Sequence, residues 1–262
     1  MGFLIILGAL KLYIYSPNDP NSGVMKKSWV IPDIHGCNKT LQALVENQIK
    51  PDKFDALYFL GDFIDRGPDS KGVLDYLMDL EAKEYQIHYL KGNHEDYCIK
   101  AWEEDRQKKH FLGMRRKKKI QKVWETLGGK ETLESFGVQY ASEIPETYIN
   151  WMQKGRYYIE LEHYILVHAG LNFNLDDPLT DTNAMLWTRE FRVAPEKIRN
   201  KKVIHGHVPV DLEFMYLVMQ SKRYHFIDLD NGVYMENRAG YGNLVAYELN
   251  SHEQRIQTNV DN

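Results

Sequence analysis

The stretch ALYFLGDFIDRGP, residues 56–68, joins a short apolar run to a polar loop that holds glycines, aspartates and an arginine. The apolar part predicts a buried strand, and Asp62 comes directly after it. A carboxylate at this position could bridge two divalent cations roughly 3.5–4 Å apart, and the guanidinium of Arg66 suits a phosphate. Taken alone, the stretch fits a glycine-bounded turn with a surface Asp–Arg pair equally well.

The first half of the chain repeats this pattern of an apolar run followed by a polar loop. Trp29–Pro32 and Ile87–Leu90 also predict buried strands. Between the strands, apolar residues recur with helical spacing, as at Leu41, Leu44 and Val45 and at Val73, Leu74, Leu77 and Leu80. Ligands in such α/β folds bind at the carboxyl ends of the strands, where the polar loops fall. The sequence therefore predicts an α/β fold with a site at that edge.

Two of these loops add further candidate ligands. In DIHG after the first strand, Asp33 and His35 are separated by one residue, so in extended backbone they point the same way and could bind one ion. In GNHE after the third strand, Asn93 offers an amide oxygen, and His94 could act as a general acid near neutral pH. An Asp-x-His string alone is more often a turn than a ligand pair.

Two histidines in the second half complete a ligand count. His168 ends an apolar run in VHAG, and His207 closes the string HGH. A single histidine at a strand end is usually structural, but together with the earlier loops these two give six mixed nitrogen and oxygen ligands, enough for two ions with open positions. The six are Asp33, His35, Asp62, Asn93, His168 and His207.

The overall charge does not point to a polyanionic partner. The 262 residues carry 33 basic and 37 acidic side chains, a formal net charge of −4, so neither nucleic acid nor an anionic membrane is expected to bind. The basic run Arg115–Lys119 predicts a solvated helix face, with contact to an acidic substrate as the alternative. Two cysteines, Cys37 and Cys98, are too few for a disulfide framework and favour reduced thiols in a cytoplasmic protein.

The chain predicts one domain at residues 25–250, with a frayed polar tail at 251–262. We expect residues 1–24 to be an N-terminal extension upstream of the natural start, because Met25 is followed closely by strand-like sequence. The early apolar run is too short to span a bilayer. Residues from about Glu95 to Phe136 predict a mostly helical insertion. Later apolar runs predict a hairpin and then an antiparallel set of strands: Tyr157–Leu161, Tyr164–Val167, Val203–Ile204, Tyr224–Ile227 and Leu244–Leu249.

The order DIHG, GDFIDRG, GNHE, HAG and HGH is similar to that of the phosphoprotein phosphatase branch of the calcineurin-like metallophosphoesterases, over nearly all of residues 28–250. The resemblance implies a central β-sandwich flanked by helices. It also implies one metal on Asp33, His35 and Asp62, and a second on Asp62, Asn93, His168 and His207. It further implies His94 as general acid oriented by Asp65, and Arg66 as phosphate clamp, with Asn93 also close to the phosphate.

Two further segments resemble bacterial members of this branch. LWTRE, residues 186–190, resembles a segment that supplies a second phosphate-binding arginine, so Arg189 is the candidate, with a solvated helix arginine as the alternative. Trp124–Gly129, leading to Ser135-Phe136-Gly137, looks like bacterial serine/threonine protein phosphatases.

The sequence therefore predicts a metal-dependent phosphatase that hydrolyses phosphate monoesters with a hydroxide held between two divalent ions. Phosphorylated protein is the expected substrate, and manganese is the expected metal, with iron or zinc as alternatives. A dinucleoside polyphosphate hydrolase, such as a symmetrical tetraphosphatase, has the same metal motifs and is the alternative. A non-catalytic phosphopeptide-binding module is disfavoured because every ligand and His94 are present.

Overall fold

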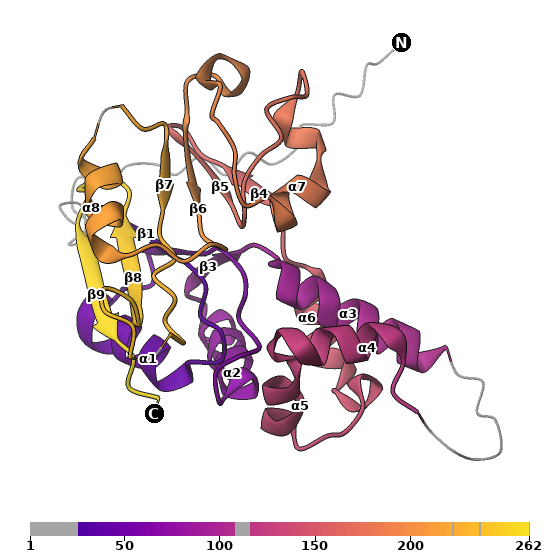
Figure 1. The fold of residues 1–262 in the computed structure, drawn as a ribbon. Coiled ribbons are helices and arrows are strands. Elements are labelled where there is room, and N and C mark those ends of the chain that lie inside the picture. The colour runs from indigo at the N-terminus through magenta and orange to yellow at the C-terminus, as the bar shows by residue number, and fades with distance from the viewer. Residues whose placement is uncertain (1–25, 108–115, 222, 236, 262) are drawn as a thin grey trace, which may run out of the picture.

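The computed structural model describes residues 26–107, 116–221, 223–235 and 237–261. The predicted N-terminal extension and Arg115 lie outside these ranges. In the described part, the chain forms two β-sheets that pack face to face, with helices on the outside (Figure 1). The predicted α/β fold, a β-sandwich flanked by helices, is confirmed.

The first sheet is five-stranded and mixed, in the order β3-β2-β1-β8-β9. Its strands are β1 (Ser28–Ile31), β2 (Ala56–Phe59), β3 (Gln86–Tyr89), β8 (Asn243–Glu248) and β9 (Gln254–Thr258). The first three strands pair in parallel, and β8 runs antiparallel to both β1 and β9. The carboxyl ends of β1, β2 and β3 therefore lie along one edge, as the strand–helix–strand order predicts.

The second sheet has four strands in the order β4-β5-β6-β7. These are β4 (Tyr158–Glu160), β5 (Tyr164–Val167), β6 (Lys202–His205) and β7 (Phe226–Asp228). The predicted hairpin is confirmed by the antiparallel pairing of β4 and β5. For Val203–Ile204 and Tyr224–Ile227 the predicted antiparallel set is wrong, because β6 pairs in parallel with both β5 and β7. The predicted run Leu244–Leu249 corresponds to β8, which is antiparallel to its neighbours but lies in the first sheet. Parallel neighbours need a crossover connection, and α7 (Thr182–Trp187) and α8 (Leu212–Gln220) lie in those two connections.

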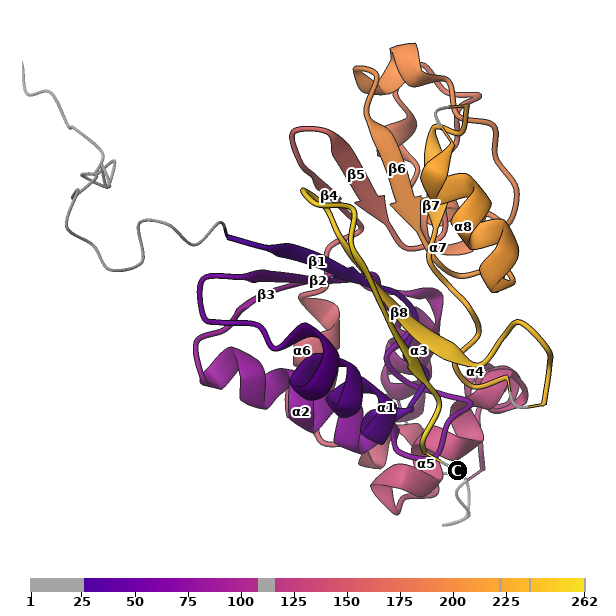
Figure 2. The same cartoon turned by 90° about the vertical axis from the view of Figure 1, so that its left-hand side faces the viewer.

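Helices cover the outer face of the first sheet (Figure 2). They are α1 (Asn38–Ala43), α2 (Ser70–Ala82), α3 (Asn93–Arg106), α4 (Lys119–Trp124), α5 (Lys130–Phe136) and α6 (Glu146–Gln153). Shorter turns of π or 3-10 type span Leu44–Ile49, Glu125–Gly129, Ala141–Glu143, Pro178–Thr180 and Pro195–Ile198. None of the described helices is both long and apolar enough to cross a bilayer.

The described part of the basic run does not form a helix face. Arg116, Lys117 and Lys118 precede α4 in non-helical backbone, and only Lys119 lies in the helix. Lys117 Nζ lies 2.8 Å from Glu125 Oε1, so that charge is already paired within the chain. The prediction of a helix face is wrong for these residues because the helical spacing begins only after them.

Apolar residues alternate between two cores along the central strands. On β1, Trp29 and Ile31 pack against the helices, whereas Val30 packs against the second sheet. On β5, Leu166 faces the first sheet, and Val167 packs on the other face, toward α7. Because side chains alternate along a strand, burying both faces of each sheet fixes the register and the position of the strand ends.

Residues 251–261 of the predicted frayed tail belong to the fold. β9 pairs with β8 along its length. Beyond it, the carboxylate of Asp261 accepts hydrogen bonds from the backbone N–H groups of Lys39 and Thr40, at 2.8 and 2.9 Å, at the start of α1. A polar strand was mistaken for a tail because backbone pairing at a sheet edge needs no apolar pattern.

Candidate metal centre

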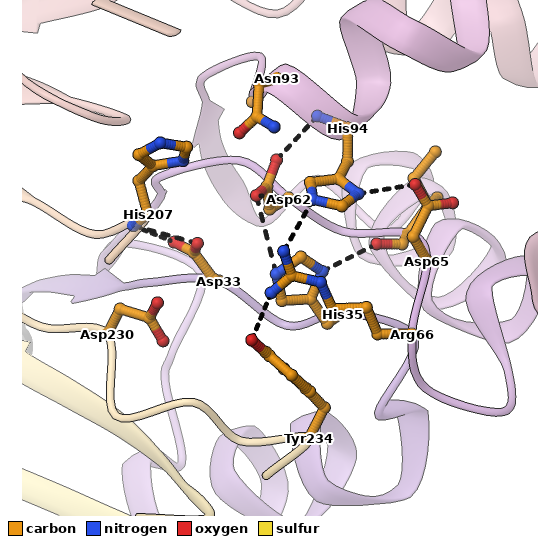
Figure 3. Close-up of polar contacts among 12 residues, drawn as sticks. Asp33, His35, Asp62, Asp65, Arg66, Asn93, His94, His207, Asp230 and Tyr234 are labelled. Carbon is orange, nitrogen blue, oxygen red and sulfur yellow. Dashed lines mark hydrogen bonds and ion pairs between the residues drawn. The ribbon is translucent and has the colours of Figure 1, made fainter. Parts of the chain in front are cut away.

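The predicted ligands converge where strands of both sheets end (Figure 3). Asp33 and His35 follow β1, Asp62 follows β2, Asn93 begins α3 just after β3, His168 follows β5 and His207 follows β6. All are buried except His207, which is half-buried. Residues more than 170 positions apart in sequence thus lie side by side, as the sequence predicts for the carboxyl ends of the strands.

Asp62 lies at the centre of the cluster. Its Oδ2 is 3.6 Å from His35 Nε2, 3.5 Å from His168 Nε2 and 3.9 Å from His94 Nε2. Burial would raise the pKa of Asp62, but the neighbouring histidines, His168 first, hold it well below its usual range. Asp62 is therefore an anion among imidazoles, as a carboxylate shared by two cations must be.

Two groups of side chains could each hold a metal ion, and both include Asp62. The first group is His35, Asp62 and His94, and the second is Asp62, His168 and His207. Asn93 joins the second group, because its Oδ1 lies 2.9 Å from His168 Nε2.

Asp33 lies against the backbone of His207 and in neither group. The N–H of His207 donates to Asp33 Oδ2 at 3.0 Å and approaches Oδ1 at 3.2 Å. The ligand sets that the resemblance implies therefore stay a prediction, with His94 standing in the first group where Asp33 was expected.

The donor set fits a divalent cation. His207 Nε2 is buried and has no hydrogen-bond partner among the described residues. Burial lowers the pKa of His207 to about 3, so its imidazole is neutral and its nitrogen can bind a metal. Imidazole, carboxylate and amide donors together suit manganese, iron or zinc.

Five residues of the site have backbone in the left-handed region, which side chains other than glycine rarely adopt. They are His35, Asp62, Asp65, Arg66 and His207, with φ between 48° and 74°. Each such residue costs on the order of 1–3 kcal/mol and persists only where the surroundings fix it. Here the N–H of His35 donates to the Asp62 carbonyl at 2.8 Å, joining two strained loops.

Glu95 fixes the same loops from the other side, a role that the sequence analysis missed. Its carboxylate accepts from the N–H groups of Asp62 at 2.9 Å, Phe63 at 2.8 Å and Gly92 at 2.8 Å. Burial, and then the charge of Asp62, raise the pKa of Glu95 to about 8. Its place three residues after Gly92, where acidic side chains often cap a helix, was the available signal.

His94 and Asp65 form a buried hydrogen-bonded pair. His94 Nδ1 lies 2.7 Å from Asp65 Oδ2, and Asp65 also accepts from Trp124 Nε1 at 2.7 Å and Thr132 Oγ1 at 2.6 Å. Burial lowers the pKa of His94, but the charge of Asp62 and the bond to Asp65 outweigh burial and raise it. The structure thus brings together the predicted acid and its orienting carboxylate, with Nε2 left to face the cluster.

Arg66 lies beside His94 at the cluster. Its Nη2 is 3.1 Å from His94 Nε2, and its guanidinium stacks on the ring of Tyr234 at 4.5 Å from the ring centre. Gly128, with φ of 113°, accepts from the Arg66 N–H at 3.2 Å, and a Cβ there would lie 2.7 Å from Arg66. The segment Trp124–Gly129 therefore positions both Asp65 and Arg66.

Arg189 lies past the end of α7 and not on a helix face. Its side chain is exposed, yet its charge contributes to the lowered pKa of His207, which places it at the rim of the cluster. A role in binding phosphate stays a prediction.

Two further residues beside the centre were missed. The hydroxyl oxygen of Tyr234 accepts a hydrogen bond from Arg66 Nη1. Asp230 is buried next to Asp33 (Figure 3). Burial raises the pKa of Asp230 to about 7. Both follow β7, which pairs in parallel with β6 and therefore ends at the same edge as His207.

The family profile of the calcineurin-like phosphoesterases matches residues 26–239. The chain belongs to this family. The prediction of a metal-dependent phosphoric ester hydrolase is confirmed at the level of the family.

Curated relatives differ in the activity that their names give. An asymmetrical bis(5'-nucleosyl)-tetraphosphatase of Oceanobacillus iheyensis is 27% identical over 244 residues, 86% of this chain and 89% of the relative. Serine/threonine-protein phosphatase 1 of Salmonella typhimurium is 40% identical over 74 residues, 28% of this chain and 32% of the relative. The matched region spans less than half the length of several curated relatives, from 25% to 45% of each.

The fold also matches solved structures. A protein serine/threonine phosphatase from Saccharomyces cerevisiae superposes with a TM-score of 0.60 at 15% identity, over 92% of this chain and 82% of that one. At this identity the likeness concerns the fold, and it agrees with the two-sheet architecture.

Proposed function

We propose that this chain hydrolyses phosphoric esters at a dinuclear metal centre built around Asp62. The observation that carries the proposal is the sharing of Asp62 by two potential ligand groups, directly beside the His94–Asp65 pair. Bound divalent cations would supply an activated water and positive charge for the phosphoryl oxygens. Manganese is the proposed metal, with iron and zinc as alternatives.

The chain's own residues would bind the phosphoryl group and protonate the leaving oxygen. His94 is held by Asp65 through Nδ1, so its Nε2, which faces Asp62 and Arg66, can carry a proton to a leaving oxygen, and the raised pKa of His94 favours that protonated form. Arg66 reaches the same point, and Arg189 approaches from the second sheet, so the two would clamp the phosphoryl oxygens. Both arginines and His94 would act on a single phosphoryl group.

For the substrate, we favour a dinucleoside polyphosphate over the phosphoprotein that the sequence predicts. The relative that aligns along most of both chains bears the name of a tetraphosphatase. A cavity of about 260 Å³ beside Arg189 gives independent support, because the rings of Phe191, His205 and Phe226 line it and could take an aromatic base.

A serine/threonine protein phosphatase remains the second candidate. Arg66 and Arg189 account for one phosphoryl group, and the described part of the basic run offers little to a polyphosphate chain because Lys117 pairs with Glu125. Similarity to the Salmonella phosphatase points the same way.

Parallel measurements of kcat/KM on diadenosine tetraphosphate and on a phosphoserine peptide, both with added Mn²⁺, test these alternatives. We expect at least about a tenfold preference for the nucleotide, which corresponds to about 1.4 kcal/mol of transition-state binding. A tenfold preference for the peptide would instead support the protein-phosphatase function. Failure to cleave either of them, or a generic aryl phosphate, would remove the enzymatic proposal altogether.

A further inference from the structure

Asp230 is a buried carboxylate held rigidly beside the centre. It follows β7, its side chain is 1% exposed, and its own N–H donates to Asp228 Oδ1 at 3.1 Å. Its carbonyl accepts from the N–H of Val210 at 2.9 Å, and its Oδ1 accepts from the N–H of Gly232 at 2.7 Å. The backbone and one carboxylate oxygen are therefore fixed, and the position of the other oxygen follows from them.

That second oxygen, Oδ2, has no hydrogen-bond partner within the described ranges, although it is fully buried. A buried carboxylate oxygen without a donor costs free energy unless a cation reaches it. Figure 3 shows the Asp230 carboxylate on the same side of the cluster as Asp33. A buried carboxylate oxygen without a hydrogen-bond partner among the described residues therefore lies at the edge of the proposed metal centre.

Asp33 and Asp230 both pack against the same side of Gly206. A Cβ at Gly206 would lie 2.2 Å from Asp33 Oδ1 and 3.6 Å from Asp230 Cβ, so both residues pack against this glycine. The charge of Arg66 acts on both carboxyls, but its guanidinium already contacts Tyr234 and His94. Two buried carboxylates packed against one glycine form a place where a divalent cation would offset the cost of burying both charges.

We propose that Asp230 is a positioning residue of the centre that raises its affinity for the divalent cation on the Asp33 side. The inference rests on the proposed dinuclear centre, to which it adds a carboxylate that no sequence motif identified. Asp230 would act by orienting Asp33, or a water on the cation, through the free Oδ2. Partners of this kind typically change metal affinity by about 10–100-fold.

The test compares Asp230→Asn with Asp228→Asn in the full chain. Asp228 is a matched control because it is also buried and ends the same strand, while its Oδ1 already accepts from the N–H of Asp230. Calorimetric titration of the metal-free proteins with Mn²⁺ gives the affinity of each binding event. We expect Asp230→Asn to weaken one of two events by about 10–100-fold and to leave the other unchanged. We expect Asp228→Asn to leave both unchanged.

Thermal unfolding of the metal-free variants provides a second measurement. At a pH above the raised pKa of Asp230, where its carboxylate is ionised, replacing it by neutral asparagine removes repulsion with Asp33, so metal-free Asp230→Asn should unfold at a higher temperature than the unmodified protein. If Asp230 served only to support the fold, metal-free Asp230→Asn should unfold at a lower temperature than the unmodified protein. The inference is overturned if Asp230→Asn binds two Mn²⁺ ions with unchanged affinity, or if both variants lose affinity equally. An unmodified protein that binds no pair of Mn²⁺ ions would instead overturn the proposed function.

Discussion

The two sheets contribute to the centre in different ways. At the edge of the first sheet, Glu95 and the His35–Asp62 backbone bond tie the three loops to one another. On the second sheet, His168 Nδ1 hydrogen-bonds to the carbonyl of Leu60 at 3.0 Å, and the N–H of His207 donates to Asp33 Oδ2 at 3.0 Å. Both of these partners belong to the first sheet. The first sheet therefore organises the site, and the second supplies ligands whose positions depend on it.

The largest effect should come from the residue that both ligand groups share. We expect Asp62→Asn to abolish activity and to lower metal content at both positions, since the central anion serves each group. Asp33→Asn should lower metal content less, because Asp33 lies outside both groups. Elemental analysis of the two purified variants checks this, and equal metal loss would contradict a bridging role for Asp62.

The next largest effect should be a slower reaction in a variant that retains its metals. We expect His94→Asn to retain two metals and to slow turnover by about 10²–10⁴-fold on esters with poor leaving groups, the usual size of a general-acid contribution. An aryl phosphate with an acidic leaving group should be affected less, because its departing oxygen needs no proton. Equal losses on both substrates would instead assign His94 to metal binding, as its place in the first ligand group allows.

Sequence reasoning succeeded where the signal was local. Asp62 and Asn93 come directly after apolar runs, so their place at one sheet edge followed from the strand pattern alone. Asp230 and Tyr234 were missed because their relevance depends on β7 lying next to β6 in parallel, and the short helices in the crossovers gave no clear spacing. β9 was missed because its polar residues carry no pattern, and the backbone ladder to β8 defines it.

A smaller effect should distinguish a buried carboxylate that supports the site from one that supports only the fold. We expect Glu95→Gln to cost about 1–3 kcal/mol of unfolding free energy, because one of its buried backbone donors loses its acceptor, and to reduce activity as well. Glu248 is the matched control, since its carboxylate likewise accepts from the N–H groups of Ser28 and Ser251, away from the site. Glu248→Gln should cost stability alone, as urea unfolding and turnover measured together would show. Loss of activity in both variants would contradict the assignment of Glu95 to the site and of Glu248 to the fold alone.

The pH dependence of the Glu248 control has a definite sign. Burial opposes ionisation, but bonds from the backbone of Ser251 and Ser28 outweigh it and lower the pKa of Glu248. A lowered pKa stabilises the fold above the unfolded value of about 4.3, and this contribution is lost as the pH falls through the folded value. The stability gap between the unmodified protein and Glu248→Gln should therefore narrow in acid. A gap that widens below pH 4 would contradict this assignment.

The smallest effect should come from the C-terminal segment, far from the chemistry. Cys37, at the cap position of α1, makes no side-chain cap hydrogen bond, and Asp261 instead accepts the N–H groups of Lys39 and Thr40 from the other end of the sequence. Replacing a helix cap by alanine costs about 0.5–2 kcal/mol, so Asp261→Ala should lower the urea midpoint with an unchanged slope and unchanged turnover. Asp211→Ala, which removes a single local cap bond from α8, should cost less. If Asp261→Ala reduced turnover as strongly as it reduced stability, the loop after β1 would depend on this cap, and the first sheet would not organise the site by itself.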